Sequence, residues 1–305
     1  MDGRVLRTFV TVARCGSFSA AADELSLTQA AVSQQIAALE TELGASLLHR
    51  RPVVPTEAGR RLLHHARAVL LRLDAARVEV ARLSGPGPAT LAVGASPLAF
   101  DARAAEAVQA VRRRFPGLEA SVHVLPRSAV AEGVATGRLD VGLLDGVVAP
   151  TDPLGHADVG LLAVEGVAED DLAVVLPAGH PLAGRPALRL HDLVDAPWID
   201  APEVAGSLHD LRAAAGSGAF APSLRCDGCD VRALLALVSA GQGLAVIPAS
   251  VAGAAEGIVA LPLVSPRLVH RIELVHATVL DEAGAGFVAA LDRTPQALRS
   301  GQSGR

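Results

Sequence analysis

The residues from Ser17 to Leu43 constrain the fold more than any other stretch, because they read as two short helices joined by a tight polar corner. Ser17 can cap a helix that runs to about Leu25, since its hydroxyl can accept one of the free N–H groups of the first turn. Thr28 can cap the next helix in the same way. Along that second helix, apolar residues recur at spacings of four, three and four: Val32, Ile36, Leu39 and Leu43. One buried face on a capped helix, directly after another short helix, predicts a helix-turn-helix.

The opposite face of the second helix carries small residues and amides, which let a helix lie close to another surface. A glutamine can bond bidentately to adenine, and Ala or Thr methyl groups can contact the thymine methyl. An Ala-rich amphipathic helix pair is also common in helical proteins that bind no DNA, so this segment alone leaves both interpretations open. If the helix enters a major groove, the expected contacts are Thr28, Gln29, Ala30, Ser33, Gln34 and Ala37.

A short wing is expected after this helix, from Leu47 to Pro55. Arg50 and Arg51 stand in it, where they can meet phosphates; such contacts position a protein on DNA without reading sequence. No arginine or lysine lies between Arg14 and Arg50. We therefore expect modest affinity for nonspecific DNA.

A long and specific pattern surrounds these helices. Its residues are Phe9, Ala13, Gly16, Ser17, Phe18, Ala21, Ala22, Leu25, Thr28, Gln29, Val32, Ser33, Ile36, Leu39, Glu40, Leu43, Gly44, Leu47, Arg50 and 56–59. Further phrases follow at 137–142, 176–183 and 240–248. This pattern resembles the LysR-type transcriptional regulators. The resemblance implies a sequence-specific DNA-binding regulator, not an enzyme, whose activity is controlled by a small-molecule effector bound between two α/β lobes.

The resemblance also implies the domain organisation and the fold class, α/β with a helix-rich head. A winged helix-turn-helix takes residues 1–60, and a linker helix with a hinge takes 61–88. The effector-binding domain takes 89–295 and is similar to periplasmic solute-binding proteins. Its first lobe is expected at 89–165 with 268–295 and its second at 166–267, while the tail at 296–305 is expected to be disordered.

Charge and composition fit a protein that offers one end to DNA. Residues 1–88 hold 11 arginines against 8 acidic residues, and the remaining 217 residues hold 16 against 24. A mildly basic head on an acidic body follows from these counts. Arginines punctuate the first helix where a signal peptide would be apolar, and no apolar run reaches the roughly 20 residues of a membrane span. A cytoplasmic protein with no membrane partner is expected.

A long helix is expected from Thr56 to about Leu83. A strict stripe at spacings of four and three runs along it: Leu62, Ala66, Val69, Leu73, Ala76, Val80 and Leu83. Such a stripe predicts packing along another helix, either in a partner or in the body of the same chain. Because family members dimerise through this helix, the resemblance implies a homo-oligomer. Family members are usually tetramers on DNA, and the sequence leaves dimer and tetramer both open.

Beyond the hinge at 85–88, short apolar runs alternate with helical stretches, which predicts α/β lobes. The chain is expected to cross between the lobes near 163–168 and 264–270. A ligand between such lobes lies at the carboxyl ends of strands and the amino ends of helices. The expected effector residues are Ser96, Pro97, Leu98, Arg127, Ser128, Asp200, Ala201, Pro202 and Gln242, with Asp145 as a further candidate.

The chemistry of these residues favours a small carboxylate or an amino acid as the effector. The guanidinium of Arg127 can clasp a carboxylate with two charge-assisted bonds, and Asp200 can hold an amino group. Ser96 and the helix start that follows it can add a hydroxyl and free N–H groups. A solvent-facing arginine on an acidic domain is the plainer alternative for Arg127.

Catalytic and metal chemistry find little support in the sequence. Gly-x-Ser-x-Gly, a phosphate loop and metal-ligand spacing are all missing, so no cofactor or metal is expected. Two alternatives to an effector-controlled regulator stay open. Cys226 and Cys229 form a lone Cys-x-x-Cys, which allows a thiol-based redox regulator. The other alternative is a DNA architectural protein that needs no ligand. RNA polymerase is a further expected partner if the chain activates transcription.

Overall fold

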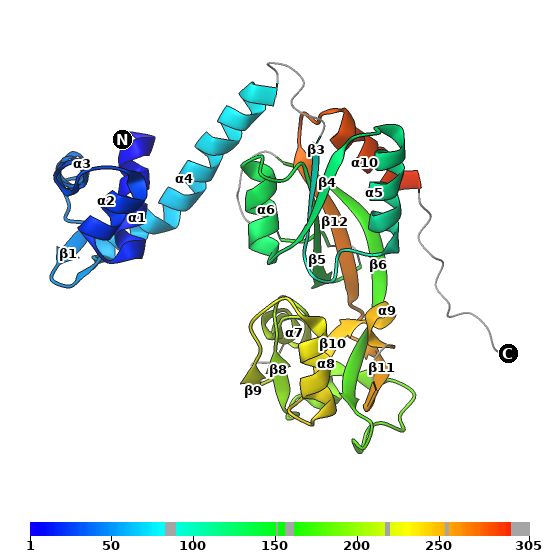
Figure 1. Ribbon diagram of the computed structural model, residues 1–305. Helices are drawn as coiled ribbons and strands as arrows, with labels where there is room; N and C mark the ends of the chain where they lie inside the picture. Colours follow the sequence, from blue (N-terminus) through cyan, green and yellow to red (C-terminus); the bar gives the residue numbers. More distant parts are fainter. Residues whose placement is uncertain (83–89, 151, 156–161, 217–219, 254–255, 294–305) are drawn as a thin grey trace. The chain divides into compact units, whose positions relative to one another are not determined.

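The computed structural model describes residues 1–82, 90–150, 152–155, 162–216, 220–253 and 256–293. These residues form two units, one up to residue 82 and the other from residue 90 onward (Figure 1). The expected hinge at 85–88, the expected tail at 296–305 and Leu83 lie outside the described residues. No helix in the described part of the chain is both long and apolar enough to cross a membrane.

Four helices and a hairpin form the first unit. The helices are α1 (Gly3–Cys15), α2 (Phe18–Leu25), α3 (Gln29–Leu43) and α4 (Glu57–Arg82), and the hairpin pairs β1 (Leu48–Arg50) with β2 (Val53–Pro55). Ser17 and Thr28 cap α2 and α3, because their hydroxyls accept N–H bonds from Ala20 and Ala31 at 3.4 and 3.2 Å. Both caps were predicted from the sequence.

The corner between α2 and α3 depends on Ser26, which ends α2 with φ +55°, in the left-handed region. The N–H of Leu27 then bonds the carbonyl of Ala22 at 2.9 Å, which closes the end of the helix. The turn brings both helices onto one core with α1 and the wing. Its buried members are Phe9, Val12, Phe18, Ala21, Ala22, Val32, Ile36, Leu39, Leu47 and Leu48.

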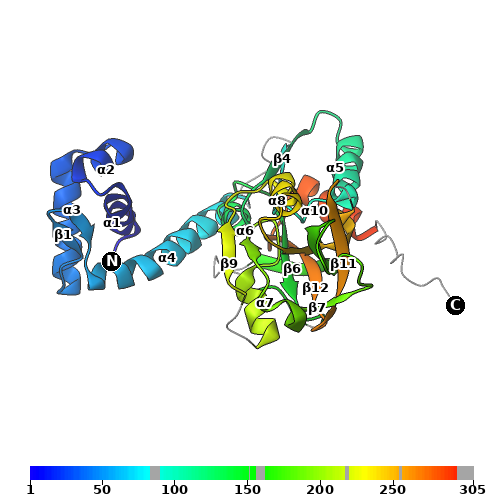
Figure 2. The same cartoon turned by 90° about the horizontal axis from the view of Figure 1, so that it is seen from below.

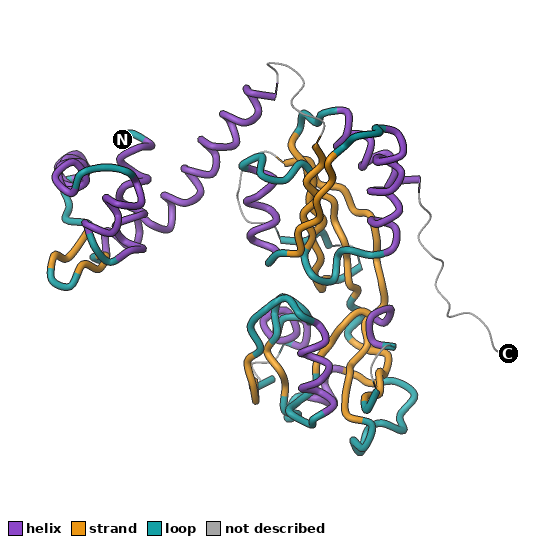
Figure 3. Tube along the Cα trace, viewed as in Figure 1, coloured by secondary structure: helices purple, strands orange, loops and turns teal. Residues whose placement is uncertain are grey.

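The first lobe of the second unit is a five-stranded sheet between helices (Figures 1 and 3). Its strands, in spatial order, are β4 (Glu119–Val124), β3 (Thr90–Ala95), β5 (Val141–Val148), β12 (Val269–Ala277) and the first part of β6 (Leu162–Pro177). α5 (Ala102–Arg114) and α10 (Glu282–Arg293) lie side by side on one face (Figure 2). α6 (Arg127–Ala135) packs against β5 and β12.

The second lobe continues the same sheet. The end of β6 pairs with β10 (Ala245–Pro248) and β11 (Ile258–Ser265), and β11 pairs with β7 (Leu188–Arg189). β8 (Trp198–Asp200) and β9 (Pro222–Arg225) form a separate parallel pair. The helices of this lobe are the short 3-10 helix at Leu190–Leu193, α7 (Leu208–Ala215), α8 (Val231–Ser239) and α9 (Ala249–Ala252). Trp198 and Phe220 are fully buried in its core.

β6 is longer than its apolar run at Leu172–Leu176 indicates. The strand begins at Leu162, and its first part pairs with β12 as far as Asp171 opposite Val269. The chain therefore leaves the first lobe after Asp171, a few residues later than the expected crossing at 163–168. Four acidic residues between 165 and 171 obscure this strand in the sequence, since Asp and Glu are depleted in strands. Arg271 on β12 offsets part of that charge by an ion pair with Glu169 at 2.9 Å.

Candidate functional site

Helix α3 presents two different faces. Val32, Ile36 and Leu39 are buried under it, as the spacing predicts. Leu43 was expected on the same face, but it is 44% exposed because it is the last residue of the helix, beyond the core. Of the expected DNA contacts, Ser33 is half-buried and the others on this helix are exposed: Gln29, Ala30, Gln34 and Ala37, with the capping residue Thr28.

Two neighbouring glutamines on α3 have different environments. The Gln35 side chain accepts a hydrogen bond from the Thr8 hydroxyl at 2.6 Å, which ties α3 to α1. The Gln34 side chain is exposed and has no hydrogen-bond partner among the described residues. Of these two glutamines, Gln34 is the one whose amide is available for a base edge.

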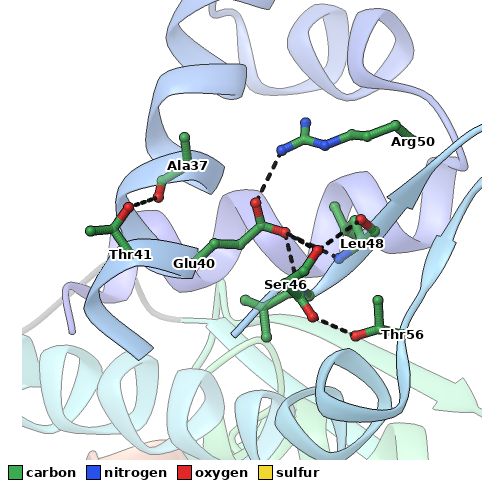
Figure 4. A network of polar contacts seen from close by, with 8 residues as sticks. Ala37, Glu40, Thr41, Ser46, Leu48, Arg50 and Thr56 are labelled. Atoms are coloured by element: carbon green, nitrogen blue, oxygen red, sulfur yellow. Dashed lines mark hydrogen bonds and ion pairs between the residues drawn. The ribbon is translucent and has the colours of Figure 1, made fainter. Parts of the chain in front are cut away.

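Glu40 joins α3 to the wing (Figure 4). Its Oε1 accepts the N–H groups of Leu47 and Leu48 at 2.8 and 3.3 Å and the Ser46 hydroxyl at 3.3 Å, and its Oε2 accepts from Arg50 at 3.1 Å. One carboxylate thus accepts hydrogen bonds from the backbone and side chain of the segment that connects α3 to β1. Glu40 was not among the predicted site residues, because its role becomes visible only when β1 is placed beside α3.

The two wing arginines are also unlike each other. The Arg50 guanidinium is paired with Glu40 and lies 4.8 Å from the centre of the Phe18 ring. Arg51 is exposed, and no carboxylate lies within ion-pair distance of it in the part of the chain that the structure describes. Arg51 therefore has its full charge available for a phosphate, whereas Arg50 also holds the wing together.

The predicted stripe on α4 is split between two surroundings. Ala66 and Leu70 are buried against Leu6 of α1 in the same chain, and Leu62 packs beside them. Further along α4, Val69 and Leu73 are 39% and 40% exposed, and Val80 is 65% exposed. The beginning of the stripe thus packs on its own chain, and its later members leave an apolar surface uncovered.

A cavity of about 350 Å³ lies at the carboxyl end of β5 in the second unit. Arg127 and Ser128 line it from the start of α6, Asp145 lines it from β5, and Asp210 lines it from α7 of the second lobe. This volume suits a small molecule. The residues that line it, among those described, do not include Ser96, Pro97, Leu98, Asp200, Ala201, Pro202 or Gln242.

Ser96 lies beneath this cavity rather than in its wall. It is fully buried, its hydroxyl donates to the carbonyl of Leu143 at 3.3 Å, and it accepts the N–H of Asp145 at 3.0 Å. Both bonds fix the backbone of β5 just where Asp145 enters the cavity wall. Ser96 thus supports a neighbouring carboxylate in this structure.

Asp145 is the charged centre of the cavity. Its side chain is 1% exposed; Oδ2 lies 3.0 Å from Nε2 of His270 and 3.3 Å from Nη2 of Arg127. Burial alone would raise the pKa of Asp145, but the hydrogen bond from His270 and the charge of Arg127 prevail and lower it. Oδ1 of Asp145 and Nε of Arg127 are buried without any partner among the described residues. The pair therefore has one unused acceptor and one unused donor.

The predicted residues of the second lobe are engaged elsewhere. Asp200 pairs with Arg225 at 3.3 Å, Ala201 is buried, and Pro202 is half-buried. The Gln242 side chain is exposed and donates to the carbonyl of Ala240 at 3.3 Å. The residue that does reach the first lobe is Glu203, directly after Pro202: its Oε2 accepts the backbone N–H of Arg127 at 3.1 Å.

The cysteines show no sign of activation. Cys226 and Cys229 are free thiols, and the pKa of Cys229 is raised by burial and by the carboxylate of Glu203. A raised pKa leaves less thiolate, which is the reactive form. No group of three or more potential metal ligands occurs in the described ranges.

Similarity to known proteins covers both units. The family "LysR substrate binding domain" matches residues 84–291, and "Bacterial regulatory helix-turn-helix protein, lysR family" matches residues 4–60. The HTH-type transcriptional regulator ShiR of Corynebacterium glutamicum is 32% identical over 300 residues, which cover 95% of this chain and 95% of ShiR. The regulator AlsR of Bacillus subtilis is 30% identical over 258 residues, covering 82% of this chain and 81% of AlsR.

Among solved structures, the LysR family transcriptional regulator CbnR matches with a TM-score of 0.53 and 25% identity, over 96% of this chain and 99% of CbnR. Helix-turn-helix head, long helix and two-lobed α/β domain thus occur together in a full-length regulator of known structure. With the two family matches, this shows that the chain belongs to the LysR family of transcriptional regulators, which are effector-controlled DNA-binding proteins and not enzymes.

Proposed function

We propose that this LysR-type regulator reads promoter DNA with the exposed face of α3, supported on the DNA backbone by its wing. The observation that supports this most strongly is the free amide of Gln34 on a helix whose other face is buried. Thr28, Gln29, Ala30, Ser33 and Ala37 would complete the base-reading surface, and Arg50 and Arg51 would contact phosphates. The DNA-binding domain then spans 1–60, as proposed from the sequence, and the protein works in the cytoplasm.

We further propose that α4 builds a homo-oligomer. Val69, Leu73 and Val80 form an apolar surface on one helix, and such exposed surface is typical of an interaction site. Two copies joined there would present two recognition helices to two half-sites, which adds the affinity of the second half-site. In this proposal 61–88 is the linker and 89–295 the effector domain. RNA polymerase is a further partner if the chain activates transcription.

The effector that we propose is a small carboxylate, and an amino acid suits the cavity better than a dicarboxylate. Arg127 and the N–H groups at the start of α6 favour a carboxylate. Oδ1 of Asp145 lacks a donor, and an amino group would supply one. Asp145 thus takes the part that the sequence suggested for Asp200, which is paired with Arg225.

Footprinting across the promoter that adjoins the gene tests this function. The full-length chain should protect an interrupted palindrome, and one metabolite from a panel of amino acids and organic acids should change the protected region. A footprint without symmetry that no metabolite alters would instead indicate an architectural protein. Calorimetry with the same panel should find one ligand that an Arg127→Ala variant binds more weakly.

A further inference from the structure

The start of α6 has an unusual N-terminal cap. Pro126 precedes the helix and offers no side-chain hydrogen bond to it. The carboxylate of Glu203 fills that place from 76 residues away in the sequence, by accepting the N–H of Arg127 at 3.1 Å. A carboxylate at this end of a helix is favoured both by the free N–H groups and by the helix dipole. Helix α6 of the first lobe is therefore capped by a residue of the second lobe.

The contact joins the two lobes at the edge of the effector cavity. Arg127 and Ser128 line the cavity from the first lobe. Glu203 stands on a fixed turn of the second lobe, because Val204 and Ala205 beside it are buried and the N–H of Gly206 bonds the carbonyl of Val246 at 2.7 Å. A change in the angle between the lobes would therefore break the bond between Glu203 and α6.

The cavity beside this contact is also lined by a buried carboxylate that is not fully hydrogen-bonded. Asp145 is buried, lines the cavity, and has one carboxylate oxygen without a donor among the described residues. The N–H groups of Ser128 and Ala129, in the first turn of α6, likewise have no acceptor in the described part of the chain. A ligand carboxylate on those N–H groups would lie at the same helix start as the Glu203 carboxylate, and two negative charges so close together repel each other.

We propose that Glu203 is a built-in competitor of the effector, whose carboxylate must displace that of Glu203 from the start of α6 and so release the bond between the lobes. The proposal rests on the proposed function, since it assumes that the cavity is the effector site. It adds the means of regulation. The ligand carboxylate and the Glu203 carboxylate cannot both occupy the start of α6, so the ligand shifts the population toward the state in which the lobes are released from each other. Without a ligand, Glu203 keeps the anion site occupied.

Acetate, the smallest carboxylate probe, tests the competition in the full-length chain. Titration followed by ¹³C NMR of labelled acetate should show a dissociation constant about tenfold lower for Glu203→Ala than for the parent, a difference of about 1.4 kcal/mol. Glu203→Gln should fall between them, because its amide oxygen remains a neutral acceptor. Acetate binding that is equal in parent and Glu203→Ala, or absent from both, would overturn the proposal.

Two controls separate competition from other roles of Glu203. Asp210→Asn removes a negative charge from the same cavity, and among the described residues the Asp210 side chain has no hydrogen bond to α6. It should therefore change acetate binding less than Glu203→Ala; an equal gain would indicate general electrostatics and refute the competitor. Ethylammonium should bind Glu203→Ala no better than the parent. If Glu203→Ala weakened ethylammonium binding and left acetate unchanged, Glu203 would be an amine receptor instead.

DNA-binding measurements distinguish failure of this proposal from failure of the proposed function on which it rests. Glu203→Ala should still protect the operator when acetate is absent, with the footprint that the parent gives at saturating acetate, because the bond between the lobes is missing in both. Circular dichroism should show an unchanged fold. If Glu203→Ala protects the operator but binds acetate no more tightly than the parent, only the competition proposal is refuted. Failure of the parent itself to protect any operator would sink the proposed function.

Discussion

The carboxylate of Glu40 accepts a hydrogen bond from the Arg50 guanidinium at 3.1 Å, and its other oxygen holds the wing backbone at Leu47 at 2.8 Å. Recognition helix and wing are thus joined by one side chain on α3. The wing arginine is consequently a structural partner as well as a candidate phosphate contact, and the two roles call for separate tests.

Glu40→Ala should destabilise the first unit by about 1–3 kcal/mol, because it leaves the N–H groups of Leu47 and Leu48 without their acceptor. It should also weaken binding to every DNA sequence, since the wing loses its attachment. Thermal unfolding and gel-shift titration check both effects. Glu42→Ala, which removes an exposed carboxylate from the same helix, is the control and should change neither.

Gln34→Ala should weaken binding to the cognate site by about 1–3 kcal/mol and leave random DNA almost unaffected, because a base contact carries sequence information. Gln35→Ala is the matched control: it should lower the melting temperature through the lost bond to Thr8 but spare base selectivity. Fluorescence anisotropy with both DNAs measures the difference. Equal weakening of cognate and random DNA by Gln34→Ala would mean that another face of α3 meets the bases.

Arg51→Ala should lower the slope of log affinity against log salt by about 1, for cognate and random DNA alike, because one released counterion is lost. Arg50→Ala should flatten the slope too, and it should also lower the melting temperature, since the pair with Glu40 disappears. Titrations at four salt concentrations check this. An unchanged slope in Arg51→Ala would exclude that arginine from the phosphate contacts.

Leu73→Glu should shift the protein toward a monomer and abolish operator binding, because a charge at the partner surface would be buried without a counterion. Since Leu73 is 40% exposed within its own chain, the monomer should remain folded. Leu70→Ala, on the buried side of the same helix, should lower stability without changing the oligomer. Sedimentation velocity measures both variants; an unchanged oligomer in Leu73→Glu would place the interface elsewhere.

Asp145→Asn should destabilise the effector domain at neutral pH by about 3–5 kcal/mol, because His270 and Arg127 lose a buried charged partner. The folded state lowers the pKa of Asp145, so its stabilisation is full above the ordinary Asp pKa of about 4 and is lost as pH falls through the lower, folded value. The parent should therefore lose stability below about pH 4, and Asp145→Asn should lose less.

Urea unfolding between pH 3 and 7 measures that difference. Asp171→Asn, which removes an exposed carboxylate, should follow the parent. A variant of Asp145 with the parent's acid profile would show that other carboxylates control the acid transition.

The helical head was predictable because its signals are local. The hydroxyls of Ser17 and Thr28 cap helices within three residues of themselves, and the spacing of Val32, Ile36 and Leu39 identifies the buried face without any other part of the chain. Arg127 and Ser128 could likewise be placed in the cavity wall, because helix starts between lobes follow a general rule.

What the sequence did not reveal depends on pairing between distant residues. Glu40 meets β1 only through the turn at the end of α3, and Asp145 meets Arg127 and His270 from three separate elements. Asp200 was expected to hold an amino group of the effector, but it forms an ion pair with Arg225. In each case, the partner that settles the role of a charge is set by tertiary packing and not by spacing.

The continuous strand β6 has a consequence for how such a protein can be rearranged. Asp171 and Val269 face each other as neighbours on antiparallel strands, and everything between them belongs to the second lobe. The first lobe's own core uses only residues outside that interval. The second lobe is therefore an insertion at the tip of a hairpin: replacing 172–268 by a tight turn should leave a self-contained five-stranded domain. The same junction offers a place where lobes from different relatives could be exchanged while the hairpin stays intact.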